Sequence, residues 1–300
     1  MQIGIDLGAT KIESVLLDQN GSEVLRERNN TPKDYKETII SIGNIVKNIE
    51  TKFNKKFSVG ICHPGTTISE TGLIKNSNNS TWMNNKPFQK DISNELNRII
   101  YCENDANCFA LSEATDGSAS HYKIVFGVIL GSGCGGGLVI DKKIVSGSNG
   151  LSGEWGHNPL PYYGNLDDED INLGEGTLVK NINIEKFISG KGLEDLYFEK
   201  KNERKSTKEI FSDVLNNKVF INNFYNRLSR SLSILINTID PDVIVFGGGV
   251  SNEIKDLNLI KKMTANFSGN LNIKTSFIKP KYGDASGVRG AAILGRQNSI

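Results

Sequence analysis

The sequence has little cysteine and histidine and no long apolar run. Its four cysteines, among 300 residues, are spread along the chain, and none stands in a C-x-x-C pair. This pattern excludes a disulfide framework and predicts reduced thiols. No apolar stretch reaches the roughly 18 residues of a membrane helix, and no basic region followed by a long apolar segment opens the chain. We therefore expect a cytoplasmic protein with no membrane partner.

An excess of charge of either sign is also absent. Lysine and arginine number 35, aspartate and glutamate number 34, and the formal net charge is +1. A balance this close to neutral gives no electrostatic basis for binding DNA or RNA. The expected partners are therefore small molecules, with no nucleic acid among them.

A pattern of strand, glycine-rich turn and strand occurs twice, about 120 residues apart. The first copy has strands at 2–6 and 14–18 around a turn at 6–11. The second has strands at 123–130 and 138–141 around a turn at 131–137. Apolar spacing predicts helices at 35–53, 91–99, 220–238 and 286–296, and strands at 99–102 and 243–246. The length is typical of about two domains, so the sequence predicts a duplicated α/β fold.

The two glycine-rich turns are candidate phosphate sites, because backbone amides can approach a phosphate closely where no Cβ intervenes. Thr10 and Ser132 would add hydroxyl donors, and Asp6 could hold Mg²⁺ directly or through water. The plain alternative is two tight hairpins. The second turn also satisfies G-x-G-x-x-G, but that dinucleotide fingerprint needs a following helix. We predict a strand there and reject the dinucleotide interpretation.

Asp105 is the candidate catalytic residue, because it stands between a predicted strand end and a predicted helix. A carboxylate in that position can take a proton from a hydroxyl that attacks phosphorus. The alternative is that Asp105 only caps the helix.

Glu154 and His157 lie three residues apart, so one helical turn would place both on the same side, where both could bind vicinal sugar hydroxyls. The alternatives are a structural histidine or a metal ligand, and the lack of a nearby cysteine argues against zinc. Trp82 could wall a sugar pocket or pack in the core. Residues 247–249, three glycines after a strand, could admit an adenine ring or form a simple turn.

Together these segments resemble the ROK family of sugar kinases, within the actin/hexokinase-like ATPase fold. The resemblance covers nearly the whole chain. It is carried by residues 5–11, 104–108, 130–137, 153–161, 240–249 and 283–292. Residues 80–82 and 154–161 are most similar to bacterial fructokinase/mannokinase members, followed by the N-acetylglucosamine kinases.

The resemblance implies two ribonuclease-H-like α/β lobes with a cleft between them. The first lobe would comprise residues 1–115 completed by the helix 286–300, and the second residues 116–285. It implies an ATP- and Mg²⁺-dependent hexose kinase that phosphorylates a sugar hydroxyl, O6. The sugar specificity expected first is that of a fructokinase, of the fructose, mannose and glucose class. The alternative is an N-acetylglucosamine or N-acetylmannosamine kinase, and the remote alternative a non-catalytic sugar-binding regulator. It also allows a homodimer.

The resemblance assigns roles residue by residue. Asp105 would be the general base. The sugar would be bound by Thr81, Asn104, Glu154, His157 and Glu185. The nucleotide would be bound by Asp6, Gly8, Ala9, Thr10, Lys11, Gly131, Ser132, Gly133, Gly248 and Gly249.

Two family features are missing from the sequence. ROK repressors need a DNA-binding segment ahead of the kinase-like part, whereas here the first predicted strand begins at residue 2. Family members usually carry three cysteines that bind a structural zinc together with the histidine. At the aligned positions this chain has Gly176, Leu178 and Asn183. We therefore expect neither a repressor nor a zinc site, and His157 must be positioned by local packing.

Overall fold

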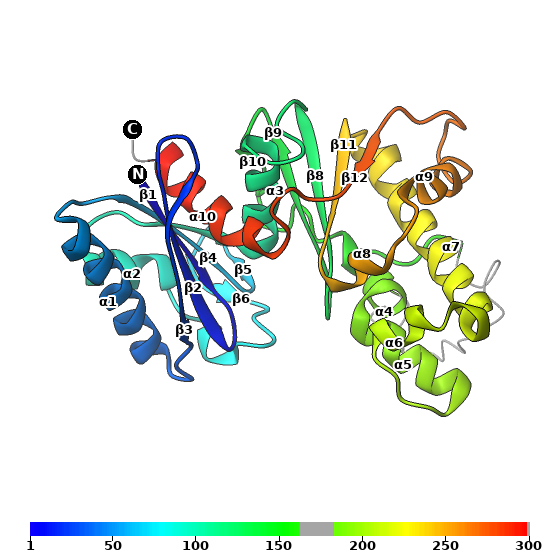
Figure 1. Ribbon diagram of the computed structural model, residues 1–300, viewed down its shortest axis with the longest axis horizontal. Coiled ribbons are helices and arrows are strands. Elements are labelled where there is room, and N and C mark those ends of the chain that lie inside the picture. Colours follow the sequence, from blue (N-terminus) through cyan, green and yellow to red (C-terminus); the bar gives the residue numbers. More distant parts are fainter. Residues whose placement is uncertain (163–182, 299–300) are drawn as a thin grey trace. The chain divides into compact units, whose positions relative to one another are not determined.

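The computed structural model describes residues 1–162 and 183–298, which form two compact units (Figure 1). The first unit comprises Met1–Lys123, Gly137–Ser152 and Pro280–Ile300, and the second Ile124–Gly136 and Gly153–Lys279. Within the described ranges, no helix is long and apolar enough to cross a membrane.

A five-stranded sheet forms the centre of the first unit, with the order β3-β2-β1-β4-β7. The strands are β1 (Gln2–Leu7), β2 (Lys11–Leu17), β3 (Glu23–Asn30), β4 (Ser58–His63) and β7 (Tyr101–Asn104). β1 pairs antiparallel with β2 and parallel with β4, and β4 pairs parallel with β7. A short hairpin of β5 (Thr66–Thr67) and β6 (Ile74–Lys75) and the single turn η1 (Thr81–Met83) follow β4. Because β1, β4 and β7 run parallel, their carboxyl ends meet at one edge of the sheet.

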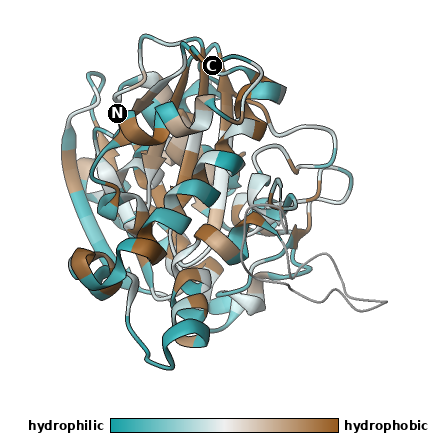
Figure 2. Ribbon diagram, turned by 90° about the vertical axis from the view of Figure 1, so that its right-hand side faces the viewer, coloured by the Kyte–Doolittle hydropathy of each residue, from teal (hydrophilic) through white to brown (hydrophobic). Residues whose placement is uncertain are grey.

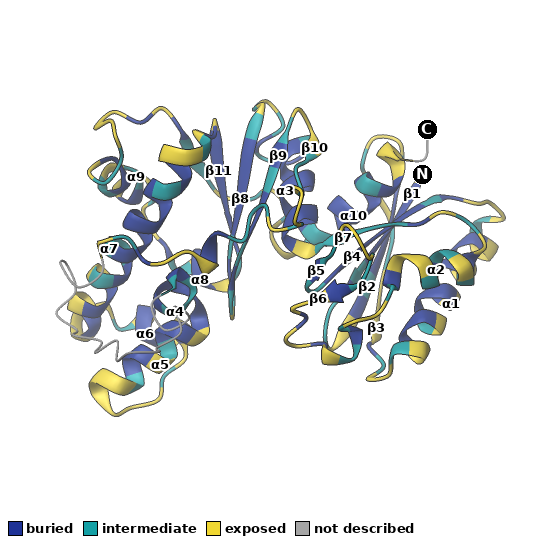
Figure 3. Ribbon diagram, turned by 180° about the vertical axis from the view of Figure 1, so that it is seen from behind, coloured by how far each residue is buried: buried dark blue, intermediate teal, exposed yellow. Residues whose placement is uncertain are grey.

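Helices cover both faces of this sheet (Figure 1). On one face, α1 (Tyr35–Phe53) and α2 (Phe88–Leu96) bury apolar side chains in one core with the strands, among them Ile42 and Ile92. On the other face lie α3 (Asp105–Thr115) and α10 (Ser286–Gln297), packed against each other. A Cβ on Gly4 would lie 2.0 Å from the Val288 carbonyl, so glycine is what allows α10 to approach β1 so closely. The central strands β1 and β4 are almost wholly buried, whereas the edge strand β3 is mostly exposed (Figure 3).

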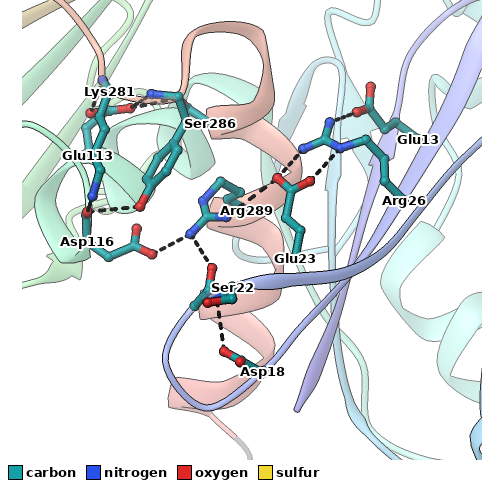
Figure 4. Close-up of polar contacts among 12 residues, drawn as sticks. Glu13, Asp18, Ser22, Glu23, Arg26, Glu113, Asp116, Lys281, Ser286 and Arg289 are labelled. Atoms are coloured by element: carbon teal, nitrogen blue, oxygen red, sulfur yellow. Dashed lines mark hydrogen bonds and ion pairs between the residues drawn. The ribbon is translucent and has the colours of Figure 1, made fainter.

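Buried polar contacts fix α3 to the segment that leads into α10 (Figure 4). Glu113 is fully buried and accepts hydrogen bonds from Ser118, from the backbone amide of Lys281 (3.0 Å) and from Ser286 Oγ (2.7 Å). One turn further along α10, Arg289 donates to Asp116 at 2.6 Å and to the Gly21 carbonyl at 2.8 Å. A buried carboxylate with this many donors is fully compensated. The network therefore holds α3, and with it Asp105, in a fixed position within the first unit.

The second unit is built on β8 (Ile124–Leu130), β11 (Val243–Gly247) and β12 (Ser276–Ile278), which pair in parallel in that order. β9 (Cys134–Ile140) begins in this unit, and its later residues pair with β10 (Lys143–Ile144) within Gly137–Ser152 of the first unit. The helices of the second unit are α4 (Ile184–Ile188), α5 (Gly190–Lys201), α6 (Thr207–Ser212), α7 (Val214–Ile239), α8 (Gly249–Glu253) and α9 (Leu257–Ala265). Helices carry both hydrophobic and hydrophilic segments (Figure 2), as expected for amphipathic helices that cover a sheet.

Most predicted elements are confirmed, with corrections to their bounds. The helix predicted at 220–238 spans Val214–Ile239, and the strand predicted at 14–18 spans Lys11–Leu17. The helix at 35–53 is observed with the predicted bounds, capped by Asp34 at its start and ended by Asn54 in the left-handed conformation. The helix predicted at 91–99 instead spans Phe88–Leu96, and the strand predicted at 99–102 spans Tyr101–Asn104. The sequence also predicts a surface loop in the polar, acidic stretch 162–170, of which residues 163–170 lie outside the described residues.

The second glycine-rich turn is shorter than predicted. β9 starts at Cys134, so the turn comprises only Gly131, Ser132 and Gly133. A Cβ on Gly136 would lie 2.8 Å from the Phe126 ring, and one on Gly137 would lie 2.6 Å from the Ala106 carbonyl. The later glycines therefore permit close packing of a strand rather than a turn. The predicted strand after the turn is confirmed, which removes the dinucleotide interpretation.

Candidate active site

The first glycine-rich turn joins β1 to β2 and contains Gly8, Ala9 and Thr10, with Lys11 opening β2. The Gly8 amide closes the turn by donating to the Lys11 carbonyl at 3.0 Å. Gly8 and Ala9 are partly buried, whereas Thr10 and Lys11 are exposed. The predicted phosphate-binding residues of the first unit therefore form one continuous turn with accessible backbone.

Asp6 lies just before this turn in β1, and its carboxylate is close enough to Asp105 to be affected by that charge. Burial, and then the charge of Asp105, raise the pKa of Asp6 from 3.8 to about 6, although a hydrogen bond with the Cys62 thiol opposes the shift. A Cβ on Gly287 would lie 3.3 Å from Asp6 Oδ2, so glycine at the start of α10 leaves room for the carboxylate. Two carboxylates that influence each other's charge make this a locally negative site.

This negative site fits a magnesium ion that is bound mainly by a nucleotide. Mg²⁺ is commonly held by one or two carboxylates together with substrate phosphates and water. Asp6 supplies one such carboxylate, and a cation beside it would offset the two causes that raise its pKa, its burial and the charge of Asp105. Among the described residues, no group of three or more histidine, cysteine, aspartate or glutamate side chains could hold a metal by itself.

Asp105 is the first residue of α3 and is exposed, while Asn104 is the residue that caps the helix. Asn104 Oδ1 accepts from the amides of Ala106 (2.8 Å) and Asn107 (3.2 Å), and its Nδ2 donates to the Gly65 carbonyl at 3.2 Å. The alternative that Asp105 is simply the N-cap is therefore wrong. The same bonds engage the Asn104 side chain with protein groups, although the resemblance implied sugar binding.

Glu103 is a residue of this site that the sequence analysis missed. Its Oε1 accepts from the Asn104 amide at 2.8 Å and from Asn107 Nδ2 at 3.2 Å, and its Oε2 accepts from Ser146 Oγ at 2.9 Å. Glu103 thus fixes the backbone immediately before Asp105. The sequence did carry a signal for Glu103, because it is a third polar residue directly beside Asn104 and Asp105.

Thr81 and Trp82 lie in η1, which precedes α2. Thr81 is exposed, and Trp82 packs partly buried against the core of the first unit. The Lys33 ammonium lies over the Trp82 ring, 5.0 Å from its centroid. Trp82 therefore has a core contact, and its predicted role beside the sugar stays a prediction.

In the second unit, Gly131, Ser132 and Gly133 form a turn closed by a 3.0 Å bond from the Gly131 amide to the Gly133 carbonyl. Glu185 of α4 contacts this turn, because its Oε2 accepts from the Cys134 amide at 2.8 Å. A Cβ on Gly133 would lie 3.0 Å from the same oxygen. The resemblance implied that Glu185 binds sugar, and the structure shows that one of its oxygens also supports the glycine turn.

Replacement of Glu185 tests this second contact. Glu185→Ala removes the acceptor of the Cys134 amide, so the turn should loosen. We expect the KM for ATP to rise about fivefold in addition to any rise in the KM for sugar, measured by coupled ADP release. Glu199→Ala, at an exposed glutamate of α5, is the matched control. An unchanged KM for ATP would show that the contact does not support nucleotide binding.

Glu154 and His157 belong to a single 3-10 turn, η2 (Trp155–His157), with Glu154 at its N-cap. Glu154 Oε2 and His157 Nδ1 lie 3.7 Å apart, which is too far for a hydrogen bond. The two side chains nevertheless lie on the same side of the turn, as predicted. The turn is held in place by Trp155, whose Nε1 donates to the Gly135 carbonyl at 2.9 Å. Packing of Trp155 therefore holds the turn, while the side chain of His157 is 56% exposed, and its positioning by packing stays a prediction.

The residues present do not fit the structural zinc of the family. Asn183 caps α4 by accepting from the Lys186 amide at 3.1 Å, and it offers no thiolate. Gly176 and Leu178, aligned with the other two cysteines, lie outside the described residues. The absence of zinc stays a prediction.

Gly248 and Gly249 lie between β11 and α8. Gly248 has a φ of +86°, and a Cβ there would lie 2.4 Å from the Leu130 carbonyl, so both the conformation and the packing require glycine. Among the described residues, nothing lies within 4 Å of a Cβ built on Gly249. The adenine site at Gly248 and Gly249 stays a prediction.

Comparison with known proteins decides the family. The family model described as "ROK family" matches residues 2–298. The chain belongs to the ROK family. An N-acetyl-D-glucosamine kinase of Mannheimia succiniciproducens is 38% identical to this ROK protein, over 98% of the chain and 99% of the relative. One of Histophilus somni is 37% identical, over 98% of both.

A solved structure supports the fold of this ROK protein. The ROK hexokinase of Thermus thermophilus superposes with a TM-score of 0.82 at 22% identity, covering 99% of this chain and 98% of that one. The predicted actin/hexokinase-like α/β fold is therefore confirmed. The predicted roles of individual residues stay predictions.

Proposed function

We propose that this ROK protein is an ATP-dependent kinase of N-acetylglucosamine. The full-length similarity to N-acetyl-D-glucosamine kinases is the observation that carries the choice of sugar. It favours the alternative of the sequence analysis over the fructose class that was placed first. The paired carboxylates of Asp6 and Asp105, next to an accessible glycine turn, support phosphoryl transfer as the reaction.

In the proposed reaction, Asp105 accepts the proton of the sugar hydroxyl, O6, as that oxygen attacks the γ-phosphorus of ATP. A bond forms between O6 and phosphorus, and the bond between phosphorus and the ADP oxygen breaks. The Asn104 cap and the Glu103 bonds hold the Asp105 backbone in place, so little reorganisation is needed when the proton moves. Magnesium, held by the nucleotide and Asp6, would neutralise the phosphate charge that develops.

A sugar panel tests the proposal. We expect ADP release to depend on added sugar, with kcat/KM for N-acetylglucosamine at least about tenfold above that for fructose, mannose, glucose and N-acetylmannosamine. This ratio would follow from a site that hydrogen-bonds the acetamido group. A preference for fructose would instead support the fructokinase reading. Sugar binding by calorimetry without ADP release would support a non-catalytic regulator.

A further inference from the structure

The three carbonyl groups of the first glycine turn are all held from one side. The Gly8 carbonyl accepts from Thr31 Oγ1 at 2.8 Å, and the Thr10 carbonyl accepts from the Thr31 amide at 3.0 Å. Between them, the Ala9 carbonyl accepts from the Lys33 ammonium at 2.7 Å. All three donors belong to residues 31–33, which connect β3 to α1.

Holding the carbonyls also aims the amides. In a trans peptide the carbonyl of one residue and the amide of the next point in opposite directions, and no peptide bond of the described chain is cis. The amides of Ala9 and Thr10 therefore point away from residues 31–33. Within the described ranges, neither amide forms a hydrogen bond. Successive amides that point the same way, without partners, form a site for an anion.

Lys33 is fixed although its side chain is exposed. Besides its bond to Ala9, its ammonium lies over the ring of Trp82, and such cation–π contacts orient a cation. The backbone before it is constrained, because Thr31 is buried and Pro32 has a fixed φ. The Thr38 hydroxyl approaches the Pro32 carbonyl at 3.3 Å. An ammonium that served only solubility would need none of these contacts.

We propose that Lys33 is a positioning residue which, with Thr31, sets the peptide planes of the glycine turn so that the Ala9 and Thr10 amides bind the terminal phosphates of a nucleotide. The identity of the anion rests on the proposed function. The orientation of the amides rests on the hydrogen bonds alone. Lys33 acts through the Ala9 carbonyl rather than as a group that reacts.

Calorimetric titration with ADP and ligand-observed NMR with adenosine test this role. In Lys33→Met, the affinity for ADP should fall about tenfold, as expected for loss of a charge-assisted hydrogen bond, while adenosine binding stays unchanged. In ADP-release assays the KM for ATP should rise with little change in the KM for sugar. Lys33→Arg should restore most of the ADP affinity, because a guanidinium can also donate to the Ala9 carbonyl.

Lys36→Met is the matched control, because Lys36 is an exposed lysine three residues further along, on α1. It should bind ADP like the wild type. Equal ADP binding by Lys33→Met and wild type would overturn the inference, as would equal losses in Lys33→Met and Lys36→Met, which would indicate a net-charge effect. A wild-type protein that does not bind ADP would instead overturn the proposed function, and with it the assignment of the anion as a nucleotide phosphate.

Discussion

Replacement of Asp105 by asparagine is expected to lower kcat by about 10³-fold while sugar and ADP binding stay within about twofold of the wild type. General-base catalysis contributes roughly 10²–10⁴ to a rate, and asparagine cannot take up the proton. The fold should be unaffected, because Asn104 caps α3 and the new amide oxygen can still accept from the Ala106 amide. Coupled ADP release gives the rate, and calorimetry gives the binding constants.

An exposed carboxylate of the same unit provides the control for Asp105. Glu27→Gln, on β3, removes one negative charge far from α3 in sequence and should leave kcat unchanged. A rate for Asp105→Asn within tenfold of the wild type would rule out Asp105 as the base. Glu103, which lies beside it, would then be the next carboxylate to replace.

Asp6→Asn is expected to stabilise the protein above pH 6 and to lower kcat by about 10²-fold or more, through loss of a carboxylate beside the phosphates. The pKa of Asp6 in the folded protein, about 6, exceeds its ordinary value of 3.8, so the folded state binds the proton more tightly than the unfolded state. The wild type therefore loses stability as the pH rises from about 4 to 6. Because Asp6 is partly exposed, we expect the variant to gain about 1–2 kcal/mol in free energy of unfolding at pH 8.

Urea unfolding without nucleotide or divalent cation, at pH 4 and at pH 8, measures this effect. The stabilisation should be present at pH 8 and absent at pH 4, where the wild-type carboxyl is already protonated. Asp34→Asn is the control, because asparagine can cap α1 as aspartate does. Its change in free energy of unfolding should be the same at both pH values. A loss of stability in Asp6→Asn at pH 8 would contradict the cost of burying the charged Asp6 carboxylate and of its repulsion from Asp105.

Regular local patterns were enough to predict much of the fold. The isoleucine spacing of α1 reports burial on one helical face, and it gave the observed helix bounds. The strand, turn and strand pattern gave both glycine turns. It could not tell where the second turn ends, because a glycine suits both a turn and a crowded strand. Phe126 leaves no room for a Cβ at Gly136, and Ala106 leaves none at Gly137. These neighbours stand 10 and 31 residues away in the sequence, so local patterns do not reveal them.

For the candidate site, the sequence by itself determined the residue types, their order and the family: a carboxylate at each of two strand ends, and two glycine turns. Only the tertiary structure decided which atoms have partners. It assigned the cap to Asn104, placed Glu185 against the second turn, and directed Lys33 to the Ala9 carbonyl. The physical reason is that propensity and periodicity act between near neighbours. A hydrogen bond, a buried charge or a missing Cβ depends on groups that chain folding brings together from distant positions.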